Sequence, residues 1–166
     1  MLQPVRRRTW APCGETPLQR AWDRHDRLSA IAALTLSPIR RDVGLYFQLL
    51  DRNIQTEDMI WFLTQMHRHF GRKIILVWDR YSVHRAAAKH FETEHPEWFT
   101  FEWLPAYAPD LNPTEQVWNH TKYADLANFI PDDVKHLDYE VHNSLNDQRK
   151  SAKLLRSFFK HADLRL

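Results

Sequence analysis

The six residues 73–78, KIILVW, constrain the fold more than any other stretch of the chain. They are almost all apolar and do not alternate with polar residues, a pattern typical of a strand buried on both faces of a parallel sheet. Asp79 follows directly, at the carboxyl end of the strand, where open α/β sheets gather ligands and catalytic groups. The run therefore predicts an α/β domain with Asp79 at a sheet edge. From the local pattern alone, Asp79 is better explained as a cap or turn former for the segment 81–84.

Other segments complete a mixed sheet flanked by helices. Two apolar runs, at 28–36 and 43–50, are joined by a short link containing Pro38 and predict antiparallel strands. An amphipathic pattern predicts a helix that begins with Thr56 as its N-cap and ends at Gly71. Further along we expect a helix over 84–94, a strand over 98–103, a loop over 105–113, and helices over 113–129, 132–146 and 152–161. We interpret residues 1–166 as one α/β domain.

The composition excludes several classes of protein. The chain has 166 residues, of which 43% are hydrophobic, enough for a core without disulfides or structural metal. Cys13 is the single cysteine, which excludes a disulfide framework and a cysteine zinc site. No apolar run has the length of a signal peptide or a membrane span. We expect a cytoplasmic protein with no membrane partner.

The net charge of +2 is unevenly distributed. Residues 1–41 carry eight Arg and three acids, and residues 148–166 carry six Lys or Arg and one acid, so each end is +5. The middle, 42–147, carries nine basic residues and seventeen acids, or −8. Basic ends around an acidic centre suit a protein that holds phosphate at its periphery and divalent cations at its centre. Ordinary solvated surface charge explains the same pattern, and charge alone favours that explanation.

Glu115 is a second candidate for chemistry. Asn112 as N-cap, Pro113 at the first helical position and Glu115 three residues after the cap match the start of a helix, and capping alone accounts for them. The same arrangement also fixes a glutamate rigidly on a first helical turn, which suits a metal ligand.

Two stretches carry a family resemblance. Residues 76–84, LVWDRYSVH, and 104–118, LPAYAPDLNPTEQVW, resemble bacterial insertion-sequence transposases related to the mariner group, known as DDE superfamily endonucleases. The thirty-five residues between Asp79 and Glu115 fit the spacing of the second and third acids of that family. Arg80 departs from the pattern, because the family has Asn after its second acid.

The resemblance implies an RNase H-like fold and a metal-dependent DNA strand-transfer reaction. Three carboxylates would hold two Mg²⁺ or Mn²⁺ ions, which stabilise the attacking and leaving oxygens at a phosphodiester. Asp79 and Glu115 would be the second and third acids, catalytic and metal-binding, with three active-site neighbours: His84, Asn112 and Arg80. For His84, ordinary hydrogen bonding in a loop or at a helix start is an equal alternative. The candidates for DNA contact are Arg6, Arg7, Arg8 and Lys122.

The first acid of the family has no counterpart in this sequence. Residues 8–12, RTWAP, resemble the segment that follows the strand bearing that acid, and no aspartate precedes them. We therefore expect the chain to lack the first, central strand of the sheet. An upstream-frame product would supply this strand, the first Asp and a helix-turn-helix domain. The partners implied are DNA (the element ends and the target) and further copies of the chain, in a bacterial, nucleoid-associated setting.

The absent acid also supports an alternative. The chain could be a catalytically inactive transposase remnant that acts at most as a DNA-binding or self-associating regulator. A histidine metal protein is a remote third hypothesis, because the spacing of the histidines matches no metal site.

Overall fold

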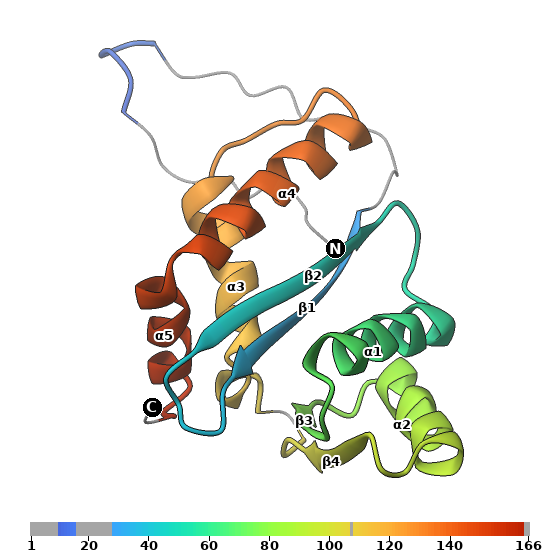
Figure 1. The fold of residues 1–166 in the computed structure, drawn as a ribbon. Helices are drawn as coiled ribbons and strands as arrows, with labels where there is room; N and C mark the ends of the chain where they lie inside the picture. The colour runs from blue at the N-terminus through green and yellow to red at the C-terminus, as the bar shows by residue number, and fades with distance from the viewer. Residues whose placement is uncertain (1–9, 16–27, 107, 165–166) are drawn as a thin grey trace.

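The computed structural model describes residues 10–15, 28–106 and 108–164 (Figure 1). The predictions for Arg6, Arg7 and Arg8, and for the start of the catalytic domain, lie outside these residues. The elements are β1 (Ser29–Leu36), β2 (Val43–Leu50), α1 (Thr56–Phe70), β3 (Ile74–Trp78), α2 (Ser82–Glu94), β4 (Phe99–Trp103), a 3₁₀ turn (Pro109–Leu111), α3 (Thr114–His120), a π-helical turn (Thr121–Asp125), α4 (Val134–Lys150) and α5 (Ala152–His161).

The antiparallel ribbon β1–β2 lies between two hydrophobic cores and contributes residues to both. Its register pairs Ser29 with Leu50 and Leu36 with Val43, as expected for the short turn between them. Because side chains alternate along a strand, the two faces carry different residues. Ile31 points into a core shared with α1 and α2, while Leu45 points into a core shared with α3, α4 and α5. Figure 1 shows α1 on one side of the ribbon and α3 to α5 on the other.

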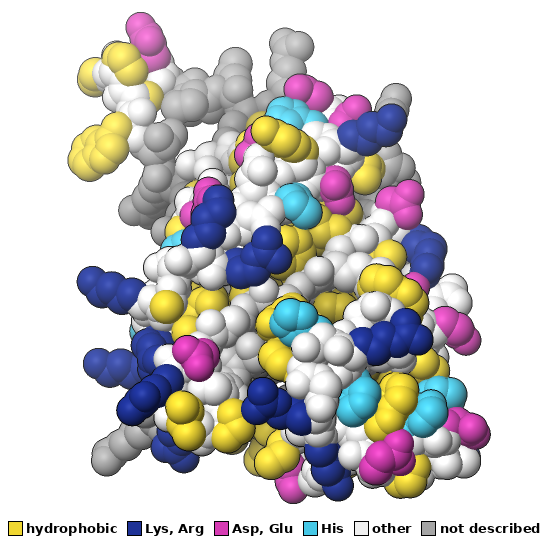
Figure 2. Space-filling view, in the orientation of Figure 1, with side chains coloured by type: hydrophobic (Ala, Val, Ile, Leu, Met, Phe, Trp, Pro, Cys, Tyr) yellow, Lys and Arg dark blue, Asp and Glu magenta, His cyan; other side chains and the backbone are white. Residues whose placement is uncertain are grey.

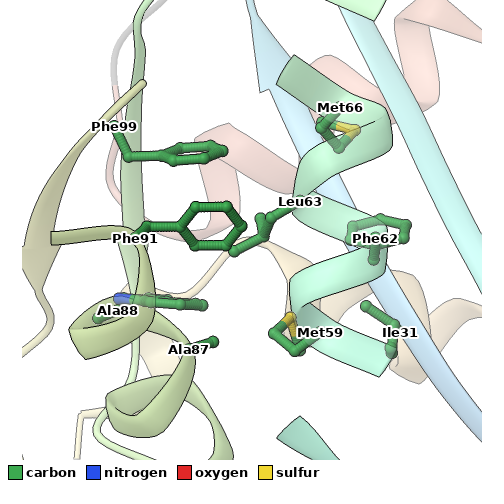
Figure 3. Close-up of a cluster of buried hydrophobic side chains, with 10 residues drawn as sticks. Ile31, Met59, Phe62, Leu63, Met66, Ala87, Ala88, Phe91 and Phe99 are labelled. Carbon is green, nitrogen blue, oxygen red and sulfur yellow. The ribbon is translucent and has the colours of Figure 1, made fainter. Parts of the chain in front are cut away.

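The first core is built mainly by α1, α2 and the parallel pair β3–β4. Met59, Phe62, Leu63 and Met66 recur at helical spacing on one face of α1 and are buried there. Figure 3 shows this face packed against Phe91 and the neighbouring residues of α2 and β4. The second core is formed where α4 and α5 cover the other face of the ribbon, with Val141, Leu145 and Leu155 fully enclosed.

The strand β3 is covered on one face only. Trp78 is buried, but Ile75 and Val77 on the opposite face are 71% and 56% exposed. The prediction of a strand buried on both faces was therefore wrong for the described residues, although β3 does pair in parallel with β4. Within the same residues the strands form two separate sheets, β1–β2 and β3–β4, rather than one continuous mixed sheet. No described element packs over the outer face of β3, which explains its exposure.

Helix boundaries differ from the predictions at three places. The N-cap of α1 is Gln55, one residue before Thr56, because Asp58 accepts the Gln55 backbone N–H at 2.9 Å and completes a capping box. The predicted helix 113–129 ends at a π-helical turn, and α4 continues to Lys150 rather than 146. Gly71 ends α1 in the left-handed region with φ 59°, as predicted. The described helices include none long and apolar enough to cross a bilayer.

Candidate active site

Asp79 lies at the carboxyl end of β3, as predicted. Its Oδ1 atom accepts the backbone N–H of Tyr81 at 3.0 Å and lies 2.6 Å from Nδ1 of His84. The turn-forming interpretation of Asp79 is thus confirmed by its bond to Tyr81. Its side chain remains 54% exposed, so the carboxylate is also open to a ligand from solvent.

His84 is held in one orientation by its neighbours. It lies in the first turn of α2, and its ring stacks on Trp78 with centroids 4.7 Å apart and planes 12° from parallel. Tyr81 contacts the same ring edge-on at 5.7 Å. Trp78 is itself buried, so the stack fixes the imidazole against the core and directs Nδ1 toward Asp79. The expected proximity of His84 to the second acid is confirmed.

Glu115 is positioned by the start of α3. The side chain of Asn112 accepts the backbone N–H of Thr114 at 3.1 Å, and the Asn112 carbonyl accepts that of Glu115 at 3.1 Å. The prediction of Asn112 as the N-cap was wrong by one residue, because the N-cap is Pro113, although the Asn112 side chain does bond to the first residue of the helix. Glu115 still lies in the first turn. These two hydrogen bonds to Asn112 hold the backbone at the start of α3 and so fix the position of Glu115.

The two acids interact electrostatically. Partial burial raises the pKa of Glu115 above its ordinary value, and the negative charge of Asp79 raises it further. Lys122 acts in the opposite direction and lowers that pKa. The charge of Asp79 therefore acts on Glu115, but it is the smallest of the three influences on that pKa, and Lys122 acts more strongly in the opposite direction.

Two of the remaining candidates are cations. Arg80 is exposed beside Asp79, and Lys122 lies on the π-helical turn that follows α3. Among the described residues no group of three His, Cys, Asp or Glu side chains is placed to hold a metal ion. Asp79, His84 and Glu115 therefore do not form such a group.

Sequence reasoning missed the polar contacts that support this end of the site. Thr121 is fully buried in the π-helical turn, where its Oγ1 atom accepts a hydrogen bond from Gln148 at 2.7 Å and lies 3.1 Å from the hydroxyl of Ser144. Ser144 also donates to Asp125 at 2.7 Å. These bonds tie the turn carrying Lys122 to α4. A signal was present, since Ser144 and Gln148 are spaced four apart on the apolar face of α4.

Comparisons with known proteins agree with this geometry. Residues 1–138 match the family described as DDE superfamily endonuclease. The crystal structure of the Mos1 strand transfer complex has a similar fold, with 18% sequence identity and a TM-score of 0.50 over 98% of this chain and 50% of that one. The chain therefore spans about half the length of that protein, and the likeness confirms the α/β, RNase H-like fold. A search of curated proteins found no match.

Proposed function

Because the chain belongs to the DDE superfamily endonuclease family, we propose that it is the catalytic domain of a transposase that cleaves DNA strands and transfers them in a metal-dependent reaction. The observation that carries the proposal is that the family match covers two acids, Asp79 directly after β3 and Glu115 in the first turn of α3. Each lies on a rigid element, one at the end of a strand and the other in the first turn of a helix. Rigid placement of this kind is needed to hold a reacting phosphate in line.

The donor set fits hard divalent cations. Carboxylate oxygens are the ligands preferred by Mg²⁺ and Mn²⁺. Burial raises the pKa of Glu115, and a bound cation would favour its ionised form and so oppose that effect. When bound, a pair of such ions would stabilise the attacking and leaving oxygens of the displaced phosphodiester. Asp79 and Glu115 would hold these ions.

The neighbouring side chains have distinct roles in this proposal. His84, stacked on Trp78, orients the carboxylate of Asp79 through the 2.6 Å contact. Asn112 fixes the start of the helix that carries Glu115. The cations of Arg80 and Lys122 would contact phosphate oxygens on either side of the acid pair.

The third carboxylate would come from outside the described residues. β1 and β3 each have a free edge within the described sheets, and a strand between them would join the two sheets into one. We propose that this strand carries the first Asp at its carboxyl end and belongs to an upstream-frame product that also carries a helix-turn-helix domain. Self-association of the chain on DNA is part of the same proposal.

The alternative is a regulator without catalytic activity. It is supported by the absence, within the described ranges, of a third side chain that could share a metal ion with Asp79 and Glu115. A transposase domain of this kind would bind DNA or copies of itself without cleaving.

Titration with Mn²⁺ followed by a strand-cleavage assay tests the proposal. The chain alone should bind Mn²⁺ weakly and leave DNA intact, whereas joining it to an apolar strand that ends in Asp should strengthen binding and restore cleavage. In that joined protein, Asp79→Ala or Glu115→Ala should abolish cleavage and reduce Mn²⁺ affinity by about tenfold or more. The matched control is Glu92→Ala, an exposed acid on α2, which should change neither. Unchanged Mn²⁺ affinity in both site variants would exclude the site, and a joined protein that binds Mn²⁺ without cleaving would favour the regulator.

A further inference from the structure

The helix α5 has two chemically opposite faces. Leu155, Phe158 and Phe159 are buried against the second core, so the apolar face is fully used by the fold. The other face carries Lys153, Arg156 and Lys160, and the helix sequence AKLLRSFFKH contains no acid. Because these residues are spaced by three and four, they lie on one side of the helix. At 1.5 Å per residue they span about 10 Å of its length.

Arg156 links this face to the turn between β1 and β2. Its guanidinium donates hydrogen bonds to the backbone carbonyl of Arg40, from both terminal nitrogens at 3.3 Å, and to that of Arg41. A carbonyl satisfies the donors of a guanidinium but does not cancel its charge. The bonds therefore place the cation of Arg156 beside the backbone of Arg41, with the charge of Arg156 retained.

No carboxylate neutralises these cations within the described part of the chain. The ion pairs found there involve none of Arg41, Lys153, Arg156 and Lys160. The neighbouring acid Asp147 is engaged by Lys150 at 2.8 Å. In Figure 2, dark blue side chains gather at the lower left, over the region where Figure 1 draws α5 and the β1–β2 turn.

We propose that Arg41, Lys153, Arg156 and Lys160 form a docking surface for the phosphate backbone of duplex DNA, separate from the acid pair. We call this surface the α5 basic face. It rests on the proposed function, because DNA is the ligand that such a domain would process. A duplex carries one negative charge per about 1.7 Å of its axis, so a 10 Å stripe of cations faces about six phosphate charges. Repulsion between unneutralised cations is relieved when phosphates lie between them.

The location suits a surface that holds DNA beyond the reacting bond. α5 packs against α3, the helix whose first turn carries Glu115. We propose that a duplex engaged at the acids extends to the α5 basic face on the outer side of this helix. Backbone contacts of this kind carry no sequence information, so the surface would position DNA of any sequence.

Salt-dependent binding of a short duplex by the whole chain, followed by fluorescence anisotropy, tests the assignment. The variant Lys153→Gln/Lys160→Gln removes two exposed cations while leaving Arg156 and its bonds to the turn. Its control is Lys73→Gln/Lys89→Gln, which removes two exposed lysines next to β3 and on α2. The first variant should weaken binding by about tenfold and reduce the slope of log K against log salt by about 2, at about 0.9 per phosphate contact. The control should keep the slope of the original chain.

Three results would overturn the proposal. Equal losses in the two variants would mean that only net charge matters, and an unchanged slope in the first would exclude α5 from the interface. Competition by poly-glutamate as effective as DNA at equal charge would assign the surface to an acidic protein instead. Mn²⁺ affinity measured on the same proteins separates this test from the proposed function, because the α5 variant should bind Mn²⁺ like the original chain. If the salt slope of the α5 variant is unchanged while Mn²⁺ binding is normal, the docking proposal has failed. If the slope falls as expected while Mn²⁺ does not bind, the proposed function has failed.

Discussion

The two sheets of this molecule are covered to different degrees. β1–β2 lies between two cores, with Ile31 enclosed on one face and Leu45 on the other. β3–β4 is covered on the face of Trp78, whereas Ile75 and Val77 are exposed. The candidate active site lies between these regions, with Asp79 at the end of the half-covered strand and Glu115 on a helix of the second core. Thus the site depends on how the half-covered sheet is held against the rest of the fold.

Core truncation should give the largest effect. Phe91→Ala in the first core should lower the free energy of unfolding by about 3–5 kcal/mol, because a fully buried aromatic ring leaves a cavity. Ile75→Ala, also an apolar truncation, should cost less than about 0.5 kcal/mol because the side chain is already in water. Urea denaturation of both variants measures the difference. A cost at Ile75 comparable to that at Phe91 would mean that the outer face of β3 is covered in solution, and the contrast between the sheets would disappear.

The same strand shows what sequence can and cannot predict. The run 73–78 correctly predicted a strand, its parallel pairing and the position of Asp79, because each follows from local pattern and chain order. Burial of its second face was predicted wrongly, because burial depends on another element lying over that face. The turn of Asn112 and Glu115 was predictable from its capping residues, to within one position. The pairing of Glu115 with Asp79 followed from the family resemblance, since no local pattern relates residues thirty-six positions apart.

The stability contributed by polar groups beside the two cores should depend differently on pH. At the first core, Asp58 accepts two hydrogen bonds of 2.6 Å from Arg52 and one from the Gln55 backbone, and these contacts hold its pKa below the ordinary value. At the second core, the fully buried Gln148 bonds to Thr121, and both of these groups are neutral. A lowered pKa gives stability that is present above the unfolded-state value of about 3.9 and is lost as pH falls through the folded-state value.

Asp58→Asn should therefore cost about 1 kcal/mol at pH 7, the usual cost of losing a helix-capping carboxylate. The loss should shrink as pH falls below about 4, because Asp58 is then protonated in the unfolded state and its stabilising effect declines until the folded-state pKa is passed. Glu57→Gln, at the adjacent exposed position, is the control and should change little at either pH. Chemical denaturation at pH 7 and pH 3 provides the measurement. A cost independent of pH would show that Asp58 acts by packing and not by its charge.

The smallest expected effect concerns Glu115, on a helix of the second core, and Asp79, at the end of the half-covered strand β3. The pKa of Glu115 is raised, first by burial and then by Asp79, so the folded state binds its proton more tightly than the unfolded state. Stability from this group is fully present below the unfolded-state pKa, about 4.3, and is lost as pH rises through the folded-state pKa. Glu115→Gln removes the ionisable group, and with it this loss of stability at higher pH. In metal-free buffer at pH 7 the variant should melt slightly higher than the original chain, and near pH 3 the two should melt together.

Asp79→Asn sharpens the same test, because it removes the smaller of the two influences that raise the pKa of Glu115 and leaves the larger one, burial. The pKa of Glu115, followed by carbon NMR of its carboxyl group, should fall toward the ordinary value in this variant but stay raised by burial. Glu92→Asn, on the exposed face of α2, is the matched change of charge and should leave the titration of Glu115 where it was. If Asp79→Asn also leaves it unchanged, the two carboxylates do not share one neighbourhood. The half-covered sheet and the second core would then be separate in solution, and the acid pair could not act on one phosphate.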